Sequence, residues 1–156
     1  MSSGSADDGP YVGAMLRMVW QWVREQIFSG VLEAGYDDVN PAHVALFRYP
    51  GLDGLRPTEL AAQLQITKQS VNDLVRHLEA RGYLVRTPDP NDGRARVVRL
   101  TTKGHRLERT VTRQSHQAEL RIAEMLGTRR FAALRHALET LSRSIAHHDL
   151  AFSTTE

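Results

Sequence analysis

Apolar residues recur at spacings of three and four between Tyr11 and Phe28, which predicts an amphipathic helix over this segment. Three further apolar residues widen the stripe beyond the face that one neighbouring layer would cover. A helix that is apolar on more than one side usually packs between two layers or between two subunits. Gly30 and Gly35 are expected to break the helical pattern. The main stripe consists of Leu16, Val19, Trp20, Val23 and Ile27, and the widening residues are Met15, Met18 and Trp22.

The middle of the chain predicts a helix-turn-helix. Pro57 suits the first position of a short helix, and Thr67 is a good N-cap for a second one. Gly82 is placed to be the left-handed residue that ends the second helix. Two helices joined by about three residues form a helix-turn-helix. A separate short helix is expected to begin at Pro41 and to end at the run from Pro50 to Gly54.

The segment that follows changes its period from helical to alternating. Residues Tyr83–Thr87 and Arg94–Leu100 are predicted to be two strands, and the turn-forming residues Pro88–Gly93 connect them. A β-hairpin directly after a helix-turn-helix makes a winged helix. The predicted fold class is therefore mainly α with a small β-hairpin wing, a winged helix-turn-helix flanked by helices at both ends.

Two helices are expected after the hairpin, one from Lys103 towards Leu126 and one after the break at Gly127. The last helix carries apolar residues at alternating spacings of three and four, which is typical of a seam between helices. These residues are Phe131, Leu134, Leu138, Leu141 and Ile145. Segments 11–28 and 120–148 thus expose more apolar surface than one subunit can cover, and we expect them to form a homodimer interface.

These patterns divide the chain into four parts. Residues 1–10 are small, polar and acidic, and they predict a disordered tail. Residues 11–50 hold N-terminal helices for dimerisation, and residues 51–102 hold the winged helix-turn-helix. Residues 103–150 hold the C-terminal dimerisation helices.

Composition narrows the class of protein. The chain has 156 residues and no Cys, which excludes disulfides, thiolate zinc sites, iron–sulfur clusters and thiol-based redox sensing. No apolar stretch approaches the ~18 residues of a membrane span, and the first ten residues lack the basic and apolar regions of a secretory signal. We therefore expect a soluble, cytoplasmic protein without a membrane partner.

The positive charge is concentrated in the middle of the chain. Residues 1–55 hold three Arg and seven acidic residues, whereas residues 56–113 hold twelve Arg and Lys and six acidic residues. Residues 114–156 hold five of each sign. The basic middle segment indicates where a polyanion would bind. A solvated face rich in arginine gives the same charge pattern.

The polar face of the second helix of the pair carries side chains that can bind DNA. Amide, guanidinium and ammonium groups hydrogen-bond base edges and phosphates in the major groove. The N-terminal end of such a helix is the part that reaches the bases. The alternative is a polar face that contacts solvent only. The candidate DNA-binding residues here are Thr67, Lys68, Gln69, Ser70, Asn72 and Arg76.

Segments Leu55–Tyr83 and Asp89–Gly104 resemble the MarR (multiple-antibiotic-resistance regulator) family. The wing signature of that family is Asp-x-Arg, an apolar strand and Leu-Thr-x-x-Gly. In helix order the resemblance extends from about residue 11 to residue 148. It implies a homodimer that binds pseudo-palindromic double-stranded DNA, usually as a repressor. The signature is matched by Asp92, Arg94, Leu100, Thr101 and Gly104.

The resemblance also assigns roles in the wing. In the family the wing Arg enters the minor groove and the wing Asp holds it by a salt bridge, which here implies Arg94 and Asp92. A narrow minor groove concentrates negative potential and attracts an inserted Arg. The alternative is that the two residues brace the turn. Arg96 is predicted to contact phosphate or to remain a solvated charge.

Many relatives in the family are released from DNA by small phenolic or aromatic ligands. The resemblance therefore implies a ligand pocket between the dimer helices and the winged helix. An aromatic residue at helical spacing is more often part of the core, and this alternative stays open. The aromatic residues that could line such a pocket are Trp20, Trp22, Tyr36, His43 and Phe47.

No other chemistry has a clear signature in the sequence. None of the seven His are paired at a spacing of three or four, which disfavours a zinc site on one helix. Phosphate-binding loops, nucleophile elbows and paired carboxylates are absent, so we expect no enzyme, no catalytic residues, no metal and no cofactor. The alternatives to a ligand-released repressor are a winged helix for protein contacts and a metal-responsive regulator.

Overall fold

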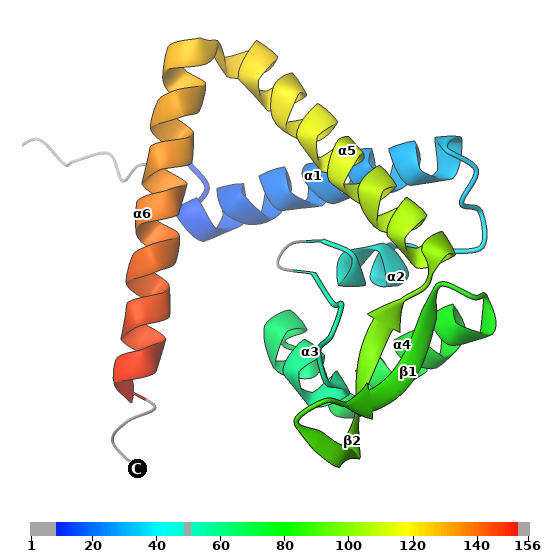
Figure 1. The fold of residues 1–156 in the computed structure, drawn as a ribbon. Coiled ribbons are helices and arrows are strands. Elements are labelled where there is room, and N and C mark those ends of the chain that lie inside the picture. The colour runs from blue at the N-terminus through cyan, green and yellow to red at the C-terminus, as the bar shows by residue number, and fades with distance from the viewer. Residues whose placement is uncertain (1–8, 49–50, 153–156) are drawn as a thin grey trace, which may run out of the picture. The chain divides into compact units, whose positions relative to one another are not determined.

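The computed structural model describes residues 9–48 and 51–152, with side chains up to Ala146. Most of the expected disordered tail, Pro50, and the last two His side chains lie outside the described residues. Six helices and a two-stranded antiparallel hairpin follow one another in these residues (Figure 1). The chain forms two compact units, one that ends at Ser115 and one that begins at His116. The predicted class, mainly α with a β-hairpin wing, is confirmed.

The helix-turn-helix forms as predicted from Pro57 and Thr67. Helix α3 spans Pro57–Leu64 with Pro57 at its first turn, and α4 spans Lys68–Ala80. The Thr67 side chain accepts the Ser70 N–H at 3.1 Å, which caps α4. Gly82, just after α4, has a φ of +76°, the left-handed geometry predicted for it. Core residues of this pair are fully buried, namely Leu60, Val71, Val75 and Leu78.

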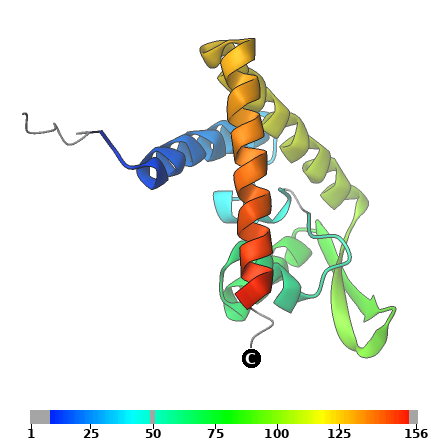
Figure 2. The same cartoon turned by 90° about the vertical axis from the view of Figure 1, so that its left-hand side faces the viewer.

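The wing is longer than the sequence pattern predicts. Strand β1 spans Leu84–Asp89 and β2 spans Asp92–Leu100, so the strands extend into the predicted turn and their last paired residues are Asp89 and Asp92. Figure 2 shows the hairpin extending away from the helices of the helix-turn-helix. Gly54 donates its N–H to the Val98 carbonyl at 2.7 Å, so the segment before α3 pairs with the other edge of β2.

Helix α1 spans Val12–Glu33 and runs through Gly30, so the expectation that Gly30 would break it is wrong. The side chain of Gln114, in helix α5 (Thr102–Leu126), occupies the place that a Cβ at position 30 would take. Gly30 therefore allows α1 and α5 to approach closely, and Gly35, with a φ of +92°, follows the helix end. The short helix α2 spans Pro41–Leu46 and begins at Pro41 as predicted.

Two 25-residue helices follow the wing, α5 over Thr102–Leu126 and α6 over Thr128–Phe152. They are separated at Gly127, whose φ is +76°. Four residues of the predicted seam on α6 are exposed in the single chain: Leu134, Leu138, Leu141 and Ile145. None of the helices in the described part of the chain has the length and hydropathy needed to cross a membrane.

Candidate functional site

The first turn of α4 presents two side chains that are available to a partner. Lys68 and Gln69 are both exposed, and neither side chain has a hydrogen bond or an ion pair among the described residues. The hydroxyls of Thr67 and Ser70 contact each other at 2.8 Å and complete the helix cap. Lys68 and Gln69 can therefore reach a ligand without breaking an existing contact, whereas Thr67 and Ser70 already have structural roles.

The next turn of α4 is held by contacts within the subunit. Asn72 donates its Nδ2–H to the Lys68 carbonyl at 3.0 Å and accepts from Arg86 Nη1 at 3.4 Å. Arg86 Nε also lies 3.2 Å from Glu79 Oε2. Asn72 is thus tied to β1, and base reading by its amide would require these hydrogen bonds to open.

Arg76 is paired more loosely, on the outer face of α4. Its Nη2 lies 2.9 Å from Asp73 Oδ1, and both side chains are well exposed. An exposed ion pair contributes only ~0–1 kcal/mol, so Arg76 can exchange Asp73 for a phosphate at little cost.

The hairpin tip differs from the arrangement that the resemblance implies. Asp92 Oδ1 accepts the backbone N–H of Arg94 at 3.1 Å, and no ion pair joins Asp92 to the Arg94 guanidinium in the described part of the chain. Instead, Asp92 Oδ2 lies 3.7 Å from Arg56 Nη2. Arg94 and Arg96 are both exposed. The expected salt bridge between Asp92 and Arg94 is therefore corrected to a backbone contact, which leaves the Arg94 guanidinium free.

Arg56 joins the start of α3 to the hairpin. Its Nε donates to Asp89 Oδ2 at 2.6 Å, and its backbone N–H donates to Glu59 at 2.6 Å. The Asp89 side chain is 8% exposed and also accepts the Asn91 N–H at 2.8 Å. The hydrogen bonds from Asn91 and Arg56 hold the pKa of Asp89 below its ordinary value. Asp89 is therefore a buried carboxylate that is charged and paired at neutral pH.

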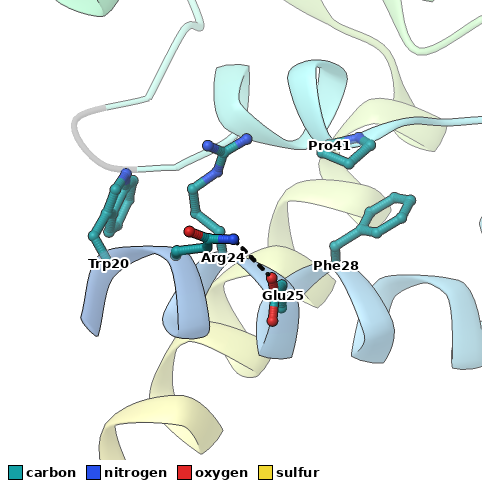
Figure 3. A pocket seen from close by; sticks show the side chains of 6 residues that line it. Trp20, Arg24, Glu25, Phe28 and Pro41 are labelled. Atoms are coloured by element: carbon teal, nitrogen blue, oxygen red, sulfur yellow. Dashed lines mark hydrogen bonds between the residues drawn. The ribbon is translucent and has the colours of Figure 1, made fainter. Parts of the chain in front are cut away.

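Two cavities lie beside α1, and Trp20 and Arg24 line both of them. The smaller cavity, of about 240 Å³, is shown in Figure 3, where Arg24 and Phe28 extend from α1 towards α2. The larger cavity, of about 360 Å³, is completed by Ala42, Ala45, Arg48, Leu64, Ile66 and Leu74. It therefore connects α1 and α2 with the helix-turn-helix.

Arg48 places a cation at the larger cavity. Its Nε and Nη1 are buried and have no hydrogen-bond partner among the described residues, and its Cζ lies 4.8 Å from the centre of the Trp20 ring. Burial, and then the charge of Arg24, lower the pKa of Arg48. None of the described residues that line this cavity is acidic. The cavity therefore combines apolar walls with two cations.

The other aromatic residues proposed for the pocket have different surroundings. His43 and Phe47 are buried in the core, Trp22 is half-buried, and Tyr36 packs 6.3 Å from the ring of Tyr83. None of these four lines either cavity. No group of three or more potential metal ligands occurs among the described residues.

His43 instead stabilises the N-terminus of helix α2. Its Nδ1 accepts the backbone N–H of Asn40 at 3.2 Å, while the Asn40 side chain accepts the His43 N–H at 3.0 Å. This reciprocal pair caps the N-terminus of α2. The His43 ring also lies 5.5 Å from the ring of His77, on α4.

Comparison with known proteins identifies a family that the middle of the chain matches. A family model described as "MarR family" matches residues 38–95, from just before α2 to the wing. This part of the chain matches the MarR family. The HTH-type transcriptional repressor Rv2887 of Mycobacterium tuberculosis is 28% identical over 138 residues, covering 88% of this chain and 97% of the relative.

Two solved structures of regulatory proteins have a similar fold. The transcriptional repressor CouR, bound to a 23-mer DNA duplex, is 27% identical with a TM-score of 0.65, covering 85% of this chain and 92% of CouR. MarR from E. coli, in its apo form, is 20% identical with a TM-score of 0.70, covering 86% of this chain and 98% of MarR. At that identity the second likeness concerns the fold alone.

Several contacts in the candidate site were not found from the sequence. Arg56 and Asp89 are 33 residues apart, and neither belongs to the wing signature. The position of Arg56 directly before Pro57, where Ser, Thr or Asp is the usual cap, is the one local sign that its side chain has another partner. Arg48 gave no signal, because its burial depends on how α1 and α2 pack.

Proposed function

We propose that this protein is a homodimeric DNA-binding transcriptional regulator, a repressor that a small aromatic or amphipathic ligand releases from a pseudo-palindromic operator. The observation that carries the proposal is a set of three side chains without a polar partner among the described residues, Lys68 and Gln69 on α4 and Arg94 on the wing. A helix and a wing of this kind fit a major groove and the adjacent minor groove. The repressor relatives and the DNA-bound CouR support the same function.

A mobility-shift titration against the DNA upstream of the protein's own gene tests the DNA-binding step. We expect Arg94→Ala to weaken binding to all sequences, and Gln69→Ala to cost about 1–3 kcal/mol and to relax base preference at one position. With roughly six phosphates neutralised per dimer, log K against log[salt] has a slope of about −5. A slope near zero, or unchanged affinity in both variants, contradicts the proposal.

The apolar residues that one chain leaves exposed on α1 and α6 support the dimer. Leu138→Asp places a charge in the proposed seam and is expected to give a monomer at micromolar concentration by sedimentation, with loss of operator binding. The matched control is His136→Asp, two residues away on a different face of α6, which is expected to remain a dimer. A monomeric unaltered protein, or equal behaviour of both variants, contradicts the dimer.

The cavity of about 360 Å³ supports the ligand step, since its size and apolar walls suit a small aromatic molecule. A ligand releases DNA only if it binds the two states of the dimer with different affinity, and a typical coupling is about 1–3 kcal/mol. Because Arg24 and Arg48 line the cavity, each aromatic acid in the screen is paired with its neutral amide. Trp20 fluorescence and DNA retention are followed together. A ligand that quenches Trp20 without releasing DNA contradicts the coupling.

A further inference from the structure

Polar contacts attach the wing to the rest of the winged helix at three places, one of which is formed by Arg86 on β1 with Asn72 and Glu79 on α4. At its base, Asp53 accepts the Leu100 N–H at 2.8 Å and lies 3.4 Å from Arg99, and Gly54 pairs with Val98. At its tip, Arg56 contacts both residues of the last strand pair, Asp89 on β1 and Asp92 on β2. The tip contact thus bridges the two strands and α3 through a single side chain.

The geometry around Arg56 makes this bridge stiff at both ends. Its backbone is the N-cap of α3, and its N–H is held by Glu59 at 2.6 Å. At the other end Asp89 has both carboxylate oxygens in use, one by Arg56 Nε and one by the Asn91 N–H. A buried carboxylate needs its cationic partner, because an unpaired charge out of water is costly. The ion pair therefore favours one position of the hairpin tip.

Arg94 depends on this position because no other described residue holds its side chain by a hydrogen bond or an ion pair. Its N–H is bonded to Asp92, the same residue that Arg56 contacts, while its guanidinium has no ion pair among the described residues. The place of the Arg94 guanidinium relative to α4 is therefore set by the backbone at the tip. A displacement of the tip would move Arg94 away from the minor groove while α4 remained in the major groove.

We propose that Arg56 is the positioning residue of the wing: through Asp89 and Asp92 it fixes the hairpin tip against α3 and so presents Arg94 to the minor groove. This inference rests on the proposed DNA binding. Arg56 acts in it through Arg94 and makes no contact of its own with DNA. The competing explanation is that Arg56, which is 38% exposed, binds a phosphate directly.

Asp89→Asn separates these explanations by the sign of its effect. The substitution removes a negative charge close to the DNA surface, so electrostatics alone predicts tighter binding. The amide oxygen of Asn can still accept the Asn91 N–H, so the turn is preserved, while the ion pair to Arg56 is lost. If Arg56 positions the wing, Asp89→Asn weakens operator binding by roughly tenfold in the same assay.

A double-mutant cycle measures whether Arg56 acts through Arg94. Arg56→Gln is expected to weaken binding by roughly tenfold in the otherwise unaltered protein, and by less than about twofold when Arg94 is already Ala. Arg99→Gln is the matched control, because it removes the same charge from an ion pair at the base of the wing. The control is expected to have the same effect with either residue at position 94. Circular dichroism and the thermal midpoint show that each variant is folded.

The outcomes distinguish this inference from the proposed function. If the unaltered protein binds no DNA, the proposed function fails and the role of Arg56 fails with it. If the unaltered protein binds DNA but folded Asp89→Asn binds equally or more tightly, the role of Arg56 alone is overturned. Additive effects of Arg56→Gln and Arg94→Ala, with the salt slope reduced by about one, would assign Arg56 to a phosphate instead.

Discussion

Helices α4 and α6 have similar apolar patterns in the sequence but very different surroundings in the structure. On α4, Val71, Val75 and Leu78 are 0% exposed. On α6, the seam from Leu134 to Ile145 is 36–53% exposed. The spacing of apolar residues therefore predicts that a face will be buried, but it does not say whether the same subunit or another one covers it.

Helix α1 has one part whose apolar residues are buried and another part whose apolar residues are exposed. Its C-terminal part packs in the core, where Ile27 is 2% exposed and Val31 is 0% exposed. Its N-terminal part leaves Met18 and Val19 at least half exposed. The exposure of apolar side chains therefore changes along α1, and the chain's own winged-helix unit buries only the C-terminal part of the helix. The wide apolar stripe predicted from the sequence is consistent with a second partner for the N-terminal part.

The largest change in the free energy of unfolding is expected in α4, whose apolar face is buried by residues of the same chain. Leu78→Ala removes a fully buried side chain from α4 and is expected to lower the free energy of unfolding by about 2–5 kcal/mol. Because its neighbours belong to the same unit, the loss should not vary with protein concentration. Urea denaturation over a hundredfold range of concentration measures this. A loss below about 1 kcal/mol would contradict the close packing of α4.

A smaller effect, of a different kind, is expected for α6. Leu141→Ala truncates an exposed residue of the seam, so it should change the unfolding of an isolated chain little. In the proposed dimer it is expected to raise the dissociation constant roughly tenfold, and the stability loss should depend on concentration. His136→Ala, on the same helix, is the control. A concentration-independent loss equal to that of Leu78→Ala would show that α6 is covered by its own chain.

The parts of the fold that sequence predicted are those set by local chemistry. Thr67 caps α4, Gly82 ends it, and Pro57 begins α3, because each of these preferences acts within a few residues. The alternating residues of the hairpin also specify their own pairing. The polar residues of α4 lie outside for the same reason, since its apolar stripe is buried, and their role in binding DNA stays a prediction.

The parts that sequence missed depend on residues far apart in the chain. Asp38 accepts a hydrogen bond from Tyr83 at 2.5 Å across 45 residues, and Asp53 caps Leu100 across 47. Nothing local indicates such partners. Gly30 was misread as a helix breaker for the same reason, because its requirement for close approach comes from Gln114.

Among the aromatic residues proposed for the pocket, some border a cavity and others do not. Trp20 was identified from its place on the first helix, and it lines both cavities. Phe47 and His43 were proposed for the same chemistry but are buried in the core. An aromatic type identifies a large, flat side chain, whereas packing decides whether that side chain borders a space or fills one.

The smallest expected effect is a change of stability with pH, which compares the buried region around α4 with the exposed helix α6. Burial, and then the charges of His77 and Arg81, lower the pKa of His43 below the ordinary value of 6.5, against an opposing contribution from Asp38. Between the lowered pKa and 6.5 the unfolded chain binds more protons than the folded one. Acid therefore favours unfolding, and stability should fall as pH drops through this window and level off below the folded pKa.

His43→Gln isolates this contribution, because a Gln at the same position of the helix cap can still accept the Asn40 N–H but does not titrate. We expect its urea midpoint to fall less than that of the unaltered protein between about pH 7.5 and about pH 5. His136→Gln, on the exposed α6, is the matched control and should keep the full dependence. The pH sensitivity would then belong to the self-covered region around α4. If His136→Gln rather than His43→Gln flattened the profile, the titrating group would lie on α6, and its environment would be less open than the single chain suggests.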